Sequence, residues 1–349
     1  MCWFQSYLEN RPQIVSADGY DSRTYIAESG VPQGTHLGPV LFSIFINDIT
    51  THLKHCNISI FADDLKIYRI VHSASDVSLI QNDLDSIKQW CDKNMMLLNA
   101  RKCFHIKYTR KKRPVRSTYY LDGLNLQEVQ EIRDLGVTID NNLTFNSHVD
   151  KVVKKSAQML GFIRRNSRAF RSVHTKILLY NVLVRSQLEY ACSAWSPFYS
   201  VHSQRIESIQ RSFTRSLAFT SPGISHRNSY ESRLAFFKMS SLRNRRKVHD
   251  LMLLHKIING KIDSPTILQG VMFNVPYQYP RQKMSKTFEL PQLKTNIGLN
   301  SPIIRMCKTY NDINLEIDDL DIFYNSSFVF KNKILKYFLE RISECPVIN

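Results

Sequence analysis

Two short segments in which apolar and polar residues alternate, 58–61 and 65–68, lie on either side of Asp63 and Asp64. A period of two residues is typical of a half-buried strand. The pattern therefore predicts a hairpin that carries both acidic residues at or beside its turn. Because residues at a hairpin end can project into one small volume, we expect the two carboxylates to lie close together.

Hydrophobic periodicity also predicts the remaining elements. In the first 140 residues we expect three helices: one over 3–8, a buried one over 40–49 with Pro39 in its first turn, and one capped by Asp76 with apolar positions 77, 80, 84, 87 and 91. We expect strands over 13–15 and 24–26, joined by a turn at 18–19. Further strands are expected over 103–109, 119–121 and 131–140, the last two joined through 122–123. From about 145 the spacing becomes helical, over 149–163, 172–194, 202–219, 230–259 and 328–343. These patterns predict an α+β fold. An antiparallel sheet with helices, residues 1–145, precedes a mostly helical region, 146–260, and a C-terminal region, 261–349, that is helical at its end.

The acidic pair has two interpretations. Asp is common in turns, so a solvated surface turn is the ordinary one. Like charges at close range repel, however, and a shared cation relieves the repulsion. Two hard oxygen donors on a rigid turn suit Mg²⁺, which carboxylates hold in enzymes of phosphoryl and nucleotidyl transfer. The four residues 61–64 alone favour the solvated turn, and the segment before them changes this.

A glycine- and proline-rich segment, 29–39, precedes the apolar run. With three Gly and two Pro in eleven positions, it cannot be the interior of a helix or of a central strand, so it is a shaped loop. Glycine lets the backbone approach a ligand closely, and the start of a helix favours negative charge. An ordinary loop would explain the apolar run after it, but not a rigid Val-Pro-Gln-Gly sequence about 30 residues before an Asp-Asp hairpin.

Together these motifs resemble the reverse transcriptase of non-LTR (LINE-type), jockey-like retrotransposons. The motifs that match in order and spacing are 29–42, 45–48 and 61–64. Further similarity covers 90–102, 134–140, 188–191, 195–197, 209–211 and, more weakly, 328–339. The resemblance extends over almost the whole chain, is strongest over 29–140, and implies a polymerase palm followed by a thumb-like helical region.

The resemblance implies RNA-templated DNA synthesis, in which a primer 3′-OH attacks the α-phosphate of a dNTP while two Mg²⁺ ions hold the attacking and leaving oxygens. It makes Asp63 a direct metal ligand and Asp64 the second, less direct one. Lys102 would be the charge partner or general acid near the leaving pyrophosphate, with an ordinary surface lysine as the alternative. The implied binding residues are Pro32, Gln33, Gly34, Phe61 and Ala62 for nucleotide and template, and Leu135, Gly136 and Val137 for the primer grip.

The family's active site has a third carboxylate, on an apolar strand upstream of the glycine loop. The acidic residues before Gly30 are Glu9, Asp18, Asp21 and Glu28, and none lies in an apolar strand. Residues 3–8 resemble the helix that follows that strand in the family. We therefore expect a truncated polymerase that lacks the fingers and the first catalytic strand, and no primer extension by this polypeptide alone.

Composition limits the class of protein. The chain has 349 residues, long enough for two or three domains, and 43% hydrophobic residues, as in globular proteins. Seven scattered cysteines without a C-x-x-C pair indicate a reducing compartment, predict no disulfide partner and argue against a zinc site. With no apolar run long enough for a membrane span and no signal-peptide pattern, we expect an intracellular protein of the nucleus or cytoplasm.

A net charge of +17 favours polyanionic partners, here an RNA template and a DNA primer. Residues 101–116 contain eight Lys and Arg and no acid, and 243–247 form a second cluster. Solvated charged faces, or a nuclear localisation signal at 110–113, are the alternatives. Contacts with the phosphate backbone, steeply dependent on salt, are expected of both clusters, and in the whole chain above all of Lys111, Lys112, Arg113, Lys154 and Lys155.

Two other functions stay open from the sequence. A non-catalytic nucleic-acid-binding protein derived from a retroelement would keep the basic faces without needing Asp63 or Asp64. A structural adaptor would need neither the faces nor the carboxylates. A group II intron-type polymerase or telomerase is a related alternative, although 188–211 is more similar to the LINE-type enzymes.

Overall fold

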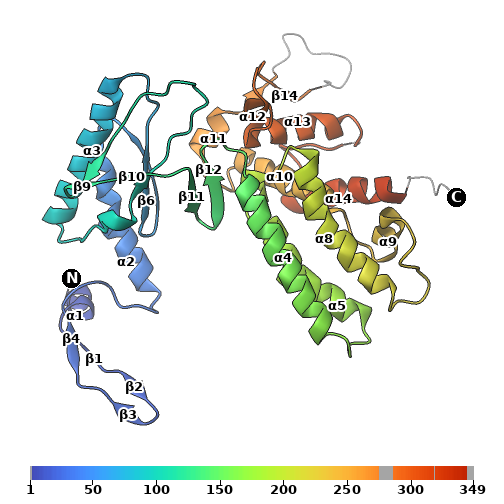
Figure 1. Ribbon diagram of the computed structural model, residues 1–349, viewed down its shortest axis with the longest axis horizontal. Helices are drawn as coiled ribbons and strands as arrows, with labels where there is room; N and C mark the ends of the chain where they lie inside the picture. Colours follow the sequence, from blue (N-terminus) through green and yellow to red (C-terminus); the bar gives the residue numbers. More distant parts are fainter. Residues whose placement is uncertain (1, 275–285, 318, 344–349) are drawn as a thin grey trace. The chain divides into compact units, whose positions relative to one another are not determined.

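The computed structural model describes residues 2–274, 286–317 and 319–343. It divides into two compact units, residues 1–130 and 131–349, each with its own hydrophobic clusters (Figure 1). Helices and short strands occur in both units, which confirms the α+β class. Each strand in the described ranges pairs with one other strand, so the expected antiparallel sheet is present only as separate two-stranded ladders.

The first unit contains most of the strands. Its helices are α1 (Cys2–Leu8), α2 (Leu37–Ile46) and α3 (Ala74–Lys93), with the 3₁₀ turns η1 (Asn47–His52) and η2 (Ala100–Lys102). Its antiparallel ladders are β1 (Arg11–Gln13) with β4 (Tyr25–Ala27), β2 (Ser16–Ala17) with β3 (Tyr20–Asp21), β5 (Asn57–Phe61) with β6 (Asp64–Tyr68), and β8 (Tyr120–Leu121) with β9 (Leu124–Asn125). Strand β7 (Phe104–His105) pairs in parallel with β10 (Gln127–Glu128). The predicted turn at Asp18 and Gly19 is confirmed, with φ values of +50° and +83°.

Helix α3 organises the core of the first unit. Its apolar side chains recur at the predicted spacing of three and four, and Leu84, Ile87 and Trp90 are buried. The helix is capped by Ser73, one turn earlier than predicted. Asp76 occupies the third helical position and accepts a hydrogen bond from the Ser73 backbone N–H at 3.1 Å, which completes a capping box.

The prediction of a buried helix over 40–49 is wrong in two respects. The α-helix ends at Ile46, and the chain continues as the 3₁₀ turn η1. Val40 and Ile44 are 53% and 68% exposed, whereas Ile46 and Ile49 are buried. Only one face of α2 contacts the core around α3, so its other apolar side chains face solvent.

Two strand predictions are also corrected. Within 103–109 only Phe104–His105 is a strand, because its partner β10 is two residues long. Residues 131–140 form a hairpin and not a single strand, because Leu135 and Gly136 adopt left-handed φ values of +43° and +84° and reverse the chain. The turn at 122–123 joins β8 to β9.

The second unit is largely helical after its first hairpin, β11 (Glu131–Asp134) with β12 (Val137–Asp140). Its helices are α4 (Asn146–Asn166), α5 (Val173–Tyr180), the π-helical η3 (Asn181–Arg185), α6 (Ser186–Glu189), α7 (Cys192–Trp195), α8 (Ser200–Ala218), α9 (Tyr230–Phe236), α10 (Leu242–Ile258), α11 (Pro265–Gln269), α12 (Asn296–Leu299), α13 (Pro302–Asn314) and α14 (Ser327–Ser343). Strand β13 (Met272–Phe273) pairs with β14 (Phe288–Glu289). The five predicted helical regions are confirmed, with 172–194 and 230–259 divided into shorter helices.

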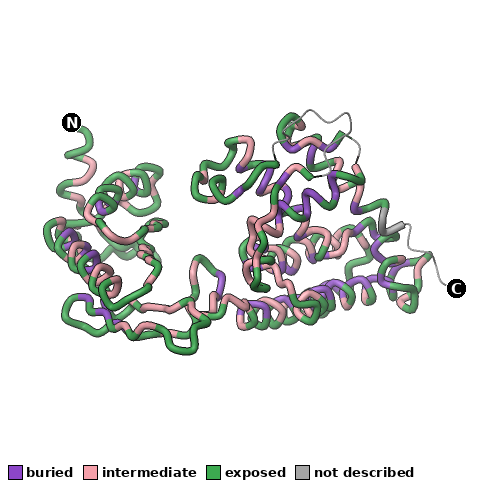
Figure 2. Tube along the Cα trace, turned by 90° about the horizontal axis from the view of Figure 1, so that it is seen from above, coloured by how far each residue is buried: buried purple, intermediate pink, exposed green. Residues whose placement is uncertain are grey.

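The second unit has two hydrophobic cores. One lies among α4, α5 and α8, where Tyr180 stacks on Phe213 with ring centroids 4.1 Å apart. Figure 2 shows buried positions recurring along the long helices of this unit, as expected of helices that bury one stripe. The other core contains Leu251, Tyr310 and Phe330 of α10, α13 and α14.

The domain boundaries that the sequence predicts near 145 and 260 stay predictions. Packing divides the chain earlier, between 130 and 131, because Val137 and Ile139 of β12 join the core formed by α4. The change from one core of the second unit to the other falls within α10, between Leu242 and Val248.

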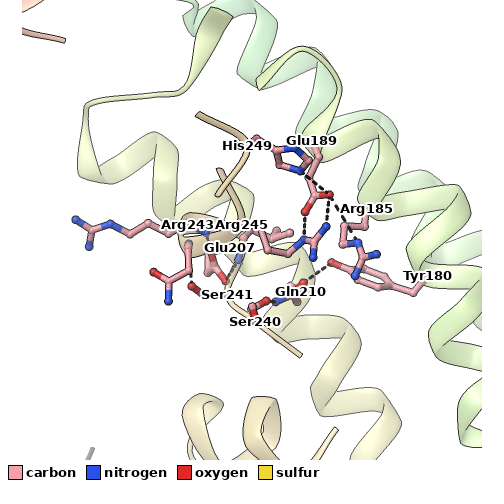
Figure 3. A network of polar contacts seen from close by, with 12 residues as sticks. Tyr180, Arg185, Glu189, Glu207, Gln210, Ser240, Ser241, Arg243, Arg245 and His249 are labelled. Carbon is pink, nitrogen blue, oxygen red and sulfur yellow. Dashed lines mark hydrogen bonds and ion pairs between the residues drawn. The ribbon is translucent and has the colours of Figure 1, made fainter. Parts of the chain in front are cut away.

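A polar network connects helices of the second unit (Figure 3). Glu189 of α6 accepts hydrogen bonds from Arg245 of α10, and its carboxylate lies 3.8 Å from Arg185 and 3.5 Å from His249. Burial alone would raise the pKa of Glu189, but hydrogen bonds from His249 and Arg245 lower it to about 2. The carboxylate is therefore charged at neutral pH and holds α6 against α10.

The cysteines of the described residues are spread over both units. The unpaired thiols among the described residues are Cys56, Cys91, Cys103, Cys192 and Cys307. Cys345 and the side chain of Cys2 lie outside the described part of the chain. Within that part, no helix combines the length and the apolar composition that crossing a bilayer requires.

Candidate functional site

The acidic pair lies at the predicted hairpin turn. Ala62 and Asp63 form the turn between β5 and β6, and Phe61 pairs with Asp64 at the last ladder position. Ala62 has a φ of +53°, a left-handed conformation that costs a non-glycine residue about 1–2 kcal/mol. Backbone strain of this kind is concentrated at functional turns. Both aspartates are exposed, so their carboxylates are accessible from solvent.

The two faces of the β5–β6 hairpin differ in burial. One face packs against the core of α2 and α3 through Ile58, Ile60, Leu65 and Ile67. Ladder pairs alternate between the faces, so the Phe61–Asp64 pair belongs to the other face, which is exposed at Phe61 and Asp64. The hairpin is thus anchored on one side and open on the side of Asp64.

A buried carboxylate positions the base of this hairpin. Asp83 of α3 is 1% exposed. It accepts hydrogen bonds from the backbone N–H groups of Lys54, His55 and Cys56 at 3.1, 2.9 and 2.7 Å. These three residues lead directly into β5, so one side chain of α3 determines where the strand begins.

The other end of the hairpin is tied to the start of α3. Arg69, just after β6, forms an ion pair with Asp76 at 3.0 Å and donates to the backbone carbonyl of His55. Asp76 also accepts from the backbone N–H of His72 at 3.0 Å. Both chain ends of the hairpin are therefore bound to one helix, and the turn with the two aspartates projects from a rigid base.

Hydrogen bonding keeps both anchoring carboxylates ionised. Burial alone would raise the pKa of Asp83, but the N–H groups of 54–56 bring it below its usual range. The N–H of His72 and then the guanidinium of Arg69 lower the pKa of Asp76 to about 2. Both groups are thus charged acceptors at neutral pH.

The glycine-rich loop is held by two residues that the sequence patterns do not single out. Arg11 of β1 donates to the carbonyl oxygens of Ser29 and Gly30, both at 2.8 Å. Tyr7 of α1 donates to the Thr35 hydroxyl at 2.7 Å. The N-terminal helix and hairpin therefore support the loop from both ends.

The loop approaches the start of α2 closely. Thr35 donates to the carbonyl oxygen of Pro32 at 3.0 Å and accepts from the N–H of Gly38 at 3.1 Å. A Cβ on Gly38 would lie 2.7 Å from the Pro32 oxygen, so this position requires glycine. Gln33 and Gly34 are exposed on this ordered loop, and Gly34 has a φ of +77°. Their contact with nucleotide and template stays a prediction.

Lys102 is exposed at the end of η2. In the described ranges no hydrogen bond or ion pair joins it to Asp63 or Asp64. Its role beside a leaving pyrophosphate stays a prediction.

The predicted primer grip lies in the second unit, at the turn of the β11–β12 hairpin. The Tyr190 hydroxyl donates to the backbone carbonyl of Leu135 at 2.9 Å. A Cβ on Gly136 would lie 3.2 Å from the Tyr190 ring, and Val137 is buried. The turn is therefore held by the chain segment after α6, and Leu135 at its tip is exposed.

The basic residues fall into two groups. The expected phosphate-binding residues are exposed, three on the loop between β7 and β8 and two on α4: Lys111, Lys112, Arg113, Lys154 and Lys155. The cluster at 243–247 is different. Arg245 pairs with Glu189, and Arg246 is buried and donates to the Ser203 hydroxyl at 3.0 Å. The expectation that this cluster contacts phosphate is wrong for these two residues, because α10 packs among other helices and turns them inward.

The donor set at the hairpin turn suits Mg²⁺. Mg²⁺ is commonly bound by one or two carboxylates, with water and substrate phosphates completing its shell. Asp63 and Asp64 supply two such carboxylates, exposed and beside a strained turn. Among the described residues, no group of three or more His, Cys, Asp or Glu is arranged to hold a metal ion.

Asp83 is the main functional residue that the sequence patterns miss. A signal for it was present, because Asp83 lies within the apolar stripe of α3, three residues after Ile80 and four before Ile87. A carboxylate at a core position must find hydrogen-bond donors. The sequence does not identify those donors, since backbone N–H groups carry no residue signature.

Comparison with known proteins agrees with the geometry. Residues 1–163 match the family described as reverse transcriptase (RNA-dependent DNA polymerase). The RNA-directed DNA polymerase from mobile element jockey of Drosophila melanogaster is 28% identical over 226 residues, 61% of this chain and 24% of that protein. The jockey polymerase of Drosophila funebris is 29% identical over 228 residues, with the same coverage.

A third relative, the probable RNA-directed DNA polymerase from transposon BS of Drosophila melanogaster, is 25% identical over 224 residues, 61% of this chain and 25% of that protein. No solved structure matches the chain with significance. The matches to these three relatives span about a quarter of their length.

Proposed function

We propose that the chain is a reverse transcriptase of the jockey-like, non-LTR retrotransposon branch and serves RNA-directed DNA synthesis, with Asp63 and Asp64 as metal ligands of the polymerising site. The observation that carries this proposal is the strained turn at Ala62, which presents two exposed carboxylates on a hairpin fixed to α3. The substrates are an RNA template, a DNA primer and dNTPs. The free thiols of the described cysteines support an intracellular site of action, in the nucleus or cytoplasm.

Each part of the site has a role in this proposal. Asp63 and Asp64 bind Mg²⁺, which supplies charge neutralisation at the attacking and leaving oxygens when bound. Asp83 keeps the hairpin, and with it both carboxylates, in one position. The loop at Gln33 and Gly34 contacts the incoming nucleotide and template, and Lys102 faces the leaving pyrophosphate.

Metal binding at the turn can be measured without polymerisation. Fe²⁺ replaces Mg²⁺ at carboxylate sites and, with ascorbate and peroxide, cleaves the backbone near the metal. We expect cleavage close to the turn at 62–64, mapped by mass spectrometry and reduced by excess Mg²⁺. The double variant Asp63→Asn, Asp64→Asn should lose this cut.

A matched control uses another hairpin of the first unit that carries two aspartates. Asp18 lies in the β2–β3 turn and Asp21 at the end of its ladder. The double variant Asp18→Asn, Asp21→Asn should leave cleavage at 62–64 unchanged. Equal loss in both double variants, or no cleavage at the turn of the unmodified chain, would refute metal binding by Asp63 and Asp64.

Primer extension is a separate question. We propose that this polypeptide alone does not extend a primer on an RNA template. In-line transfer uses two metal ions, and the two carboxylates of the described site are too few ligands to hold both. The measurement is incorporation of labelled dNTP with Mg²⁺. Robust incorporation would overturn this expectation and would support the polymerase function directly.

Nucleic-acid binding should depend steeply on salt. Lys111, Lys112 and Arg113 are exposed on one loop, and each phosphate contact releases about one counterion. Replacing all three by Gln should lower the slope of log affinity against log salt by about 3. A slope unchanged by these substitutions would exclude the loop as a phosphate-binding segment.

A non-catalytic nucleic-acid-binding protein is the second candidate. It is favoured by the exposed basic residues, which are independent of the acidic turn. The Asp63→Asn, Asp64→Asn variant discriminates between the two functions. Metal-independent RNA binding with no metal cleavage in the unmodified chain would favour the second candidate.

A further inference from the structure

A basic surface with an exposed aromatic ring lies at one end of the helices of the second unit. It is formed by the C-terminal ends of α4 and α8 and the loops that follow them, which lie at the same end of these helices (Figure 1). We call it the bundle-end surface. Its exposed members are Arg165, Arg168, Arg171, Arg215, Phe219 and Arg227.

Hydrogen bonds hold the helices together at this end. Arg164 of α4 donates to the hydroxyl of Ser212 of α8 at 2.9 Å. Lys176 of α5 donates to the Thr220 hydroxyl, just after α8, at 3.3 Å. The arginines of the two loops are therefore carried on one packed scaffold.

Positive charge predominates in this region. No Asp or Glu occurs in the sequence between Asp150 and Glu189, a stretch with nine Lys and Arg, or between Glu207 and Glu231, a stretch with three Arg. An ordinary solvated face mixes charges of both signs, because like charges repel at close range. A polyanion that follows the surface relieves this repulsion and releases its own counterions.

A buried guanidinium adds to the positive potential. Arg233 of α9 is 3% exposed, and its acceptors are neutral: the Thr214 hydroxyl and the backbone carbonyls of His226 and Asn228. Burial, and then the charge of Arg215, lower the pKa of Arg233, but a guanidinium stays protonated in proteins. Arg233 thus holds the loop after α8 in place through neutral acceptors, and among the described residues the Glu231 carboxylate acts on its charge without a salt bridge between them.

An aromatic platform stands on the same loop. Phe219 stacks on His226 with ring centroids 4.0 Å apart and an angle of 14° between the rings. Although His226 covers one face of the Phe219 ring, the residue is 65% exposed, so the other face is open. A flat, supported ring beside phosphate-binding cations is the arrangement on which unpaired bases stack.

We propose that the bundle-end surface binds single-stranded nucleic acid, with its arginines on the phosphates and an unpaired base stacked on Phe219. A single strand fits better than a duplex, because the bases of a duplex are stacked on one another and cannot cover the ring. The proposal does not rest on the carboxylates of the first unit, so it can hold if the proposed polymerase function fails.

The test measures fluorescence anisotropy of the full-length chain with three labelled ligands of equal length: a single-stranded oligouridine, an abasic sugar-phosphate strand and a duplex. Phe219→Leu keeps an apolar side chain and removes the ring. It should weaken binding of the oligouridine about tenfold and leave the abasic strand and the duplex unchanged. Phe328→Leu, at an exposed phenylalanine of α14, is the matched control.

The charge contribution has its own variant. Arg168→Gln with Arg171→Gln should weaken binding of all three ligands and lower the salt slope by about 2. Lys308→Gln, at an exposed cation of α13, should change neither. The chain carrying Asp63→Asn and Asp64→Asn should bind oligouridine like the unmodified chain, which separates this surface from the acidic turn.

A crosslink locates the base independently of any substitution. A strand with 5-iodouridine, irradiated on the unmodified chain, should attach to the peptide that contains Phe219. Two results together would overturn the proposal: Phe219→Leu loses no more oligouridine affinity than Phe328→Leu does, and the crosslink lies elsewhere in the chain. So would an arginine variant that loses binding to phosphatidylserine vesicles but keeps its affinity for oligouridine, since that result identifies a membrane surface as the partner.

Discussion

Replacing Asp83 by alanine should release the base of the β5–β6 hairpin while leaving both carboxylates of its turn in the sequence. In the structure this side chain accepts three backbone N–H groups, from Lys54, His55 and Cys56. Without it, three donors lose a charged acceptor in a position that water reaches poorly. The turn should then lose its fixed position, although Asp63 and Asp64 are intact.

The expected cost can be worked out from these contacts. A hydrogen bond to a charged group contributes about 1.5–3 kcal/mol net, and a buried donor left unsatisfied costs about 1–3 kcal/mol. The three bonds share one carboxylate, so their energies do not add. We expect about 3–5 kcal/mol for Asp83→Ala, at the upper end of single substitutions. Asp83→Asn should cost about 1–3 kcal/mol, because its amide oxygen still accepts.

Hydrogen exchange with mass spectrometry is the suitable assay, because a chain of two units need not unfold in one step. Amides of 54–56 and of both strands should exchange faster in the variants, and Fe²⁺ cleavage at the turn should weaken in proportion. Asp85→Asn, on the exposed side of the same helix, is the control. Protection and cleavage unchanged in Asp83→Ala would refute the idea that this carboxylate positions the hairpin.

Acid gives a second measurement of the same group. The pKa of Asp83 is lower in the folded chain than in the unfolded one, where it is about 3.9. Its contribution is therefore present above about pH 4 and is lost as the pH falls through the folded pKa. The stability difference between the unmodified chain and Asp83→Asn should shrink on acidification below about pH 4.

Three further substitutions test other parts of the structure. Gly38→Ala places a Cβ 2.7 Å from the Pro32 carbonyl oxygen and should destabilise the loop by about 1–3 kcal/mol, measured as a lower melting temperature. Asp76→Asn should reduce stability above about pH 4, and the difference should disappear as the pH falls toward 2, since hydrogen bonds to Asp76 lower its pKa to about 2. Glu189→Ala leaves Arg245 without its partly buried partner and should cost about 2–3 kcal/mol in chemical denaturation. Replacing both residues of that pair by apolar ones should recover most of the loss.

Local patterns predicted the parts of the structure that depend on short-range geometry. The alternation around Asp63 and Asp64 indicated two strands, and the observed register pairs them about the turn. The helical spacing from Val149 to Ile163 likewise predicted α4, because a helix that buries one stripe repeats its apolar residues at that spacing.

Two errors have a common cause. The apolar residues of α2 predict that its side chains can be buried. They do not predict whether another segment packs over Ile44, which is exposed. The inward direction of Arg245 depends on Glu189, 56 residues earlier in the chain, and no local pattern connects the two. Contacts between distant segments decide burial, and periodicity contains no information about them.

The way in which Asp83 holds residues 54–56 has a consequence for how the sequence can change over time. Its hydrogen bonds involve main-chain N–H groups, which every amino acid except proline possesses. The side chains of Lys54 and His55 can therefore be exchanged freely in evolution or in a randomised library without moving the strand that follows. Proline at any of these three positions removes a donor, so selection at Lys54 and His55 should tolerate nineteen amino acids and reject one.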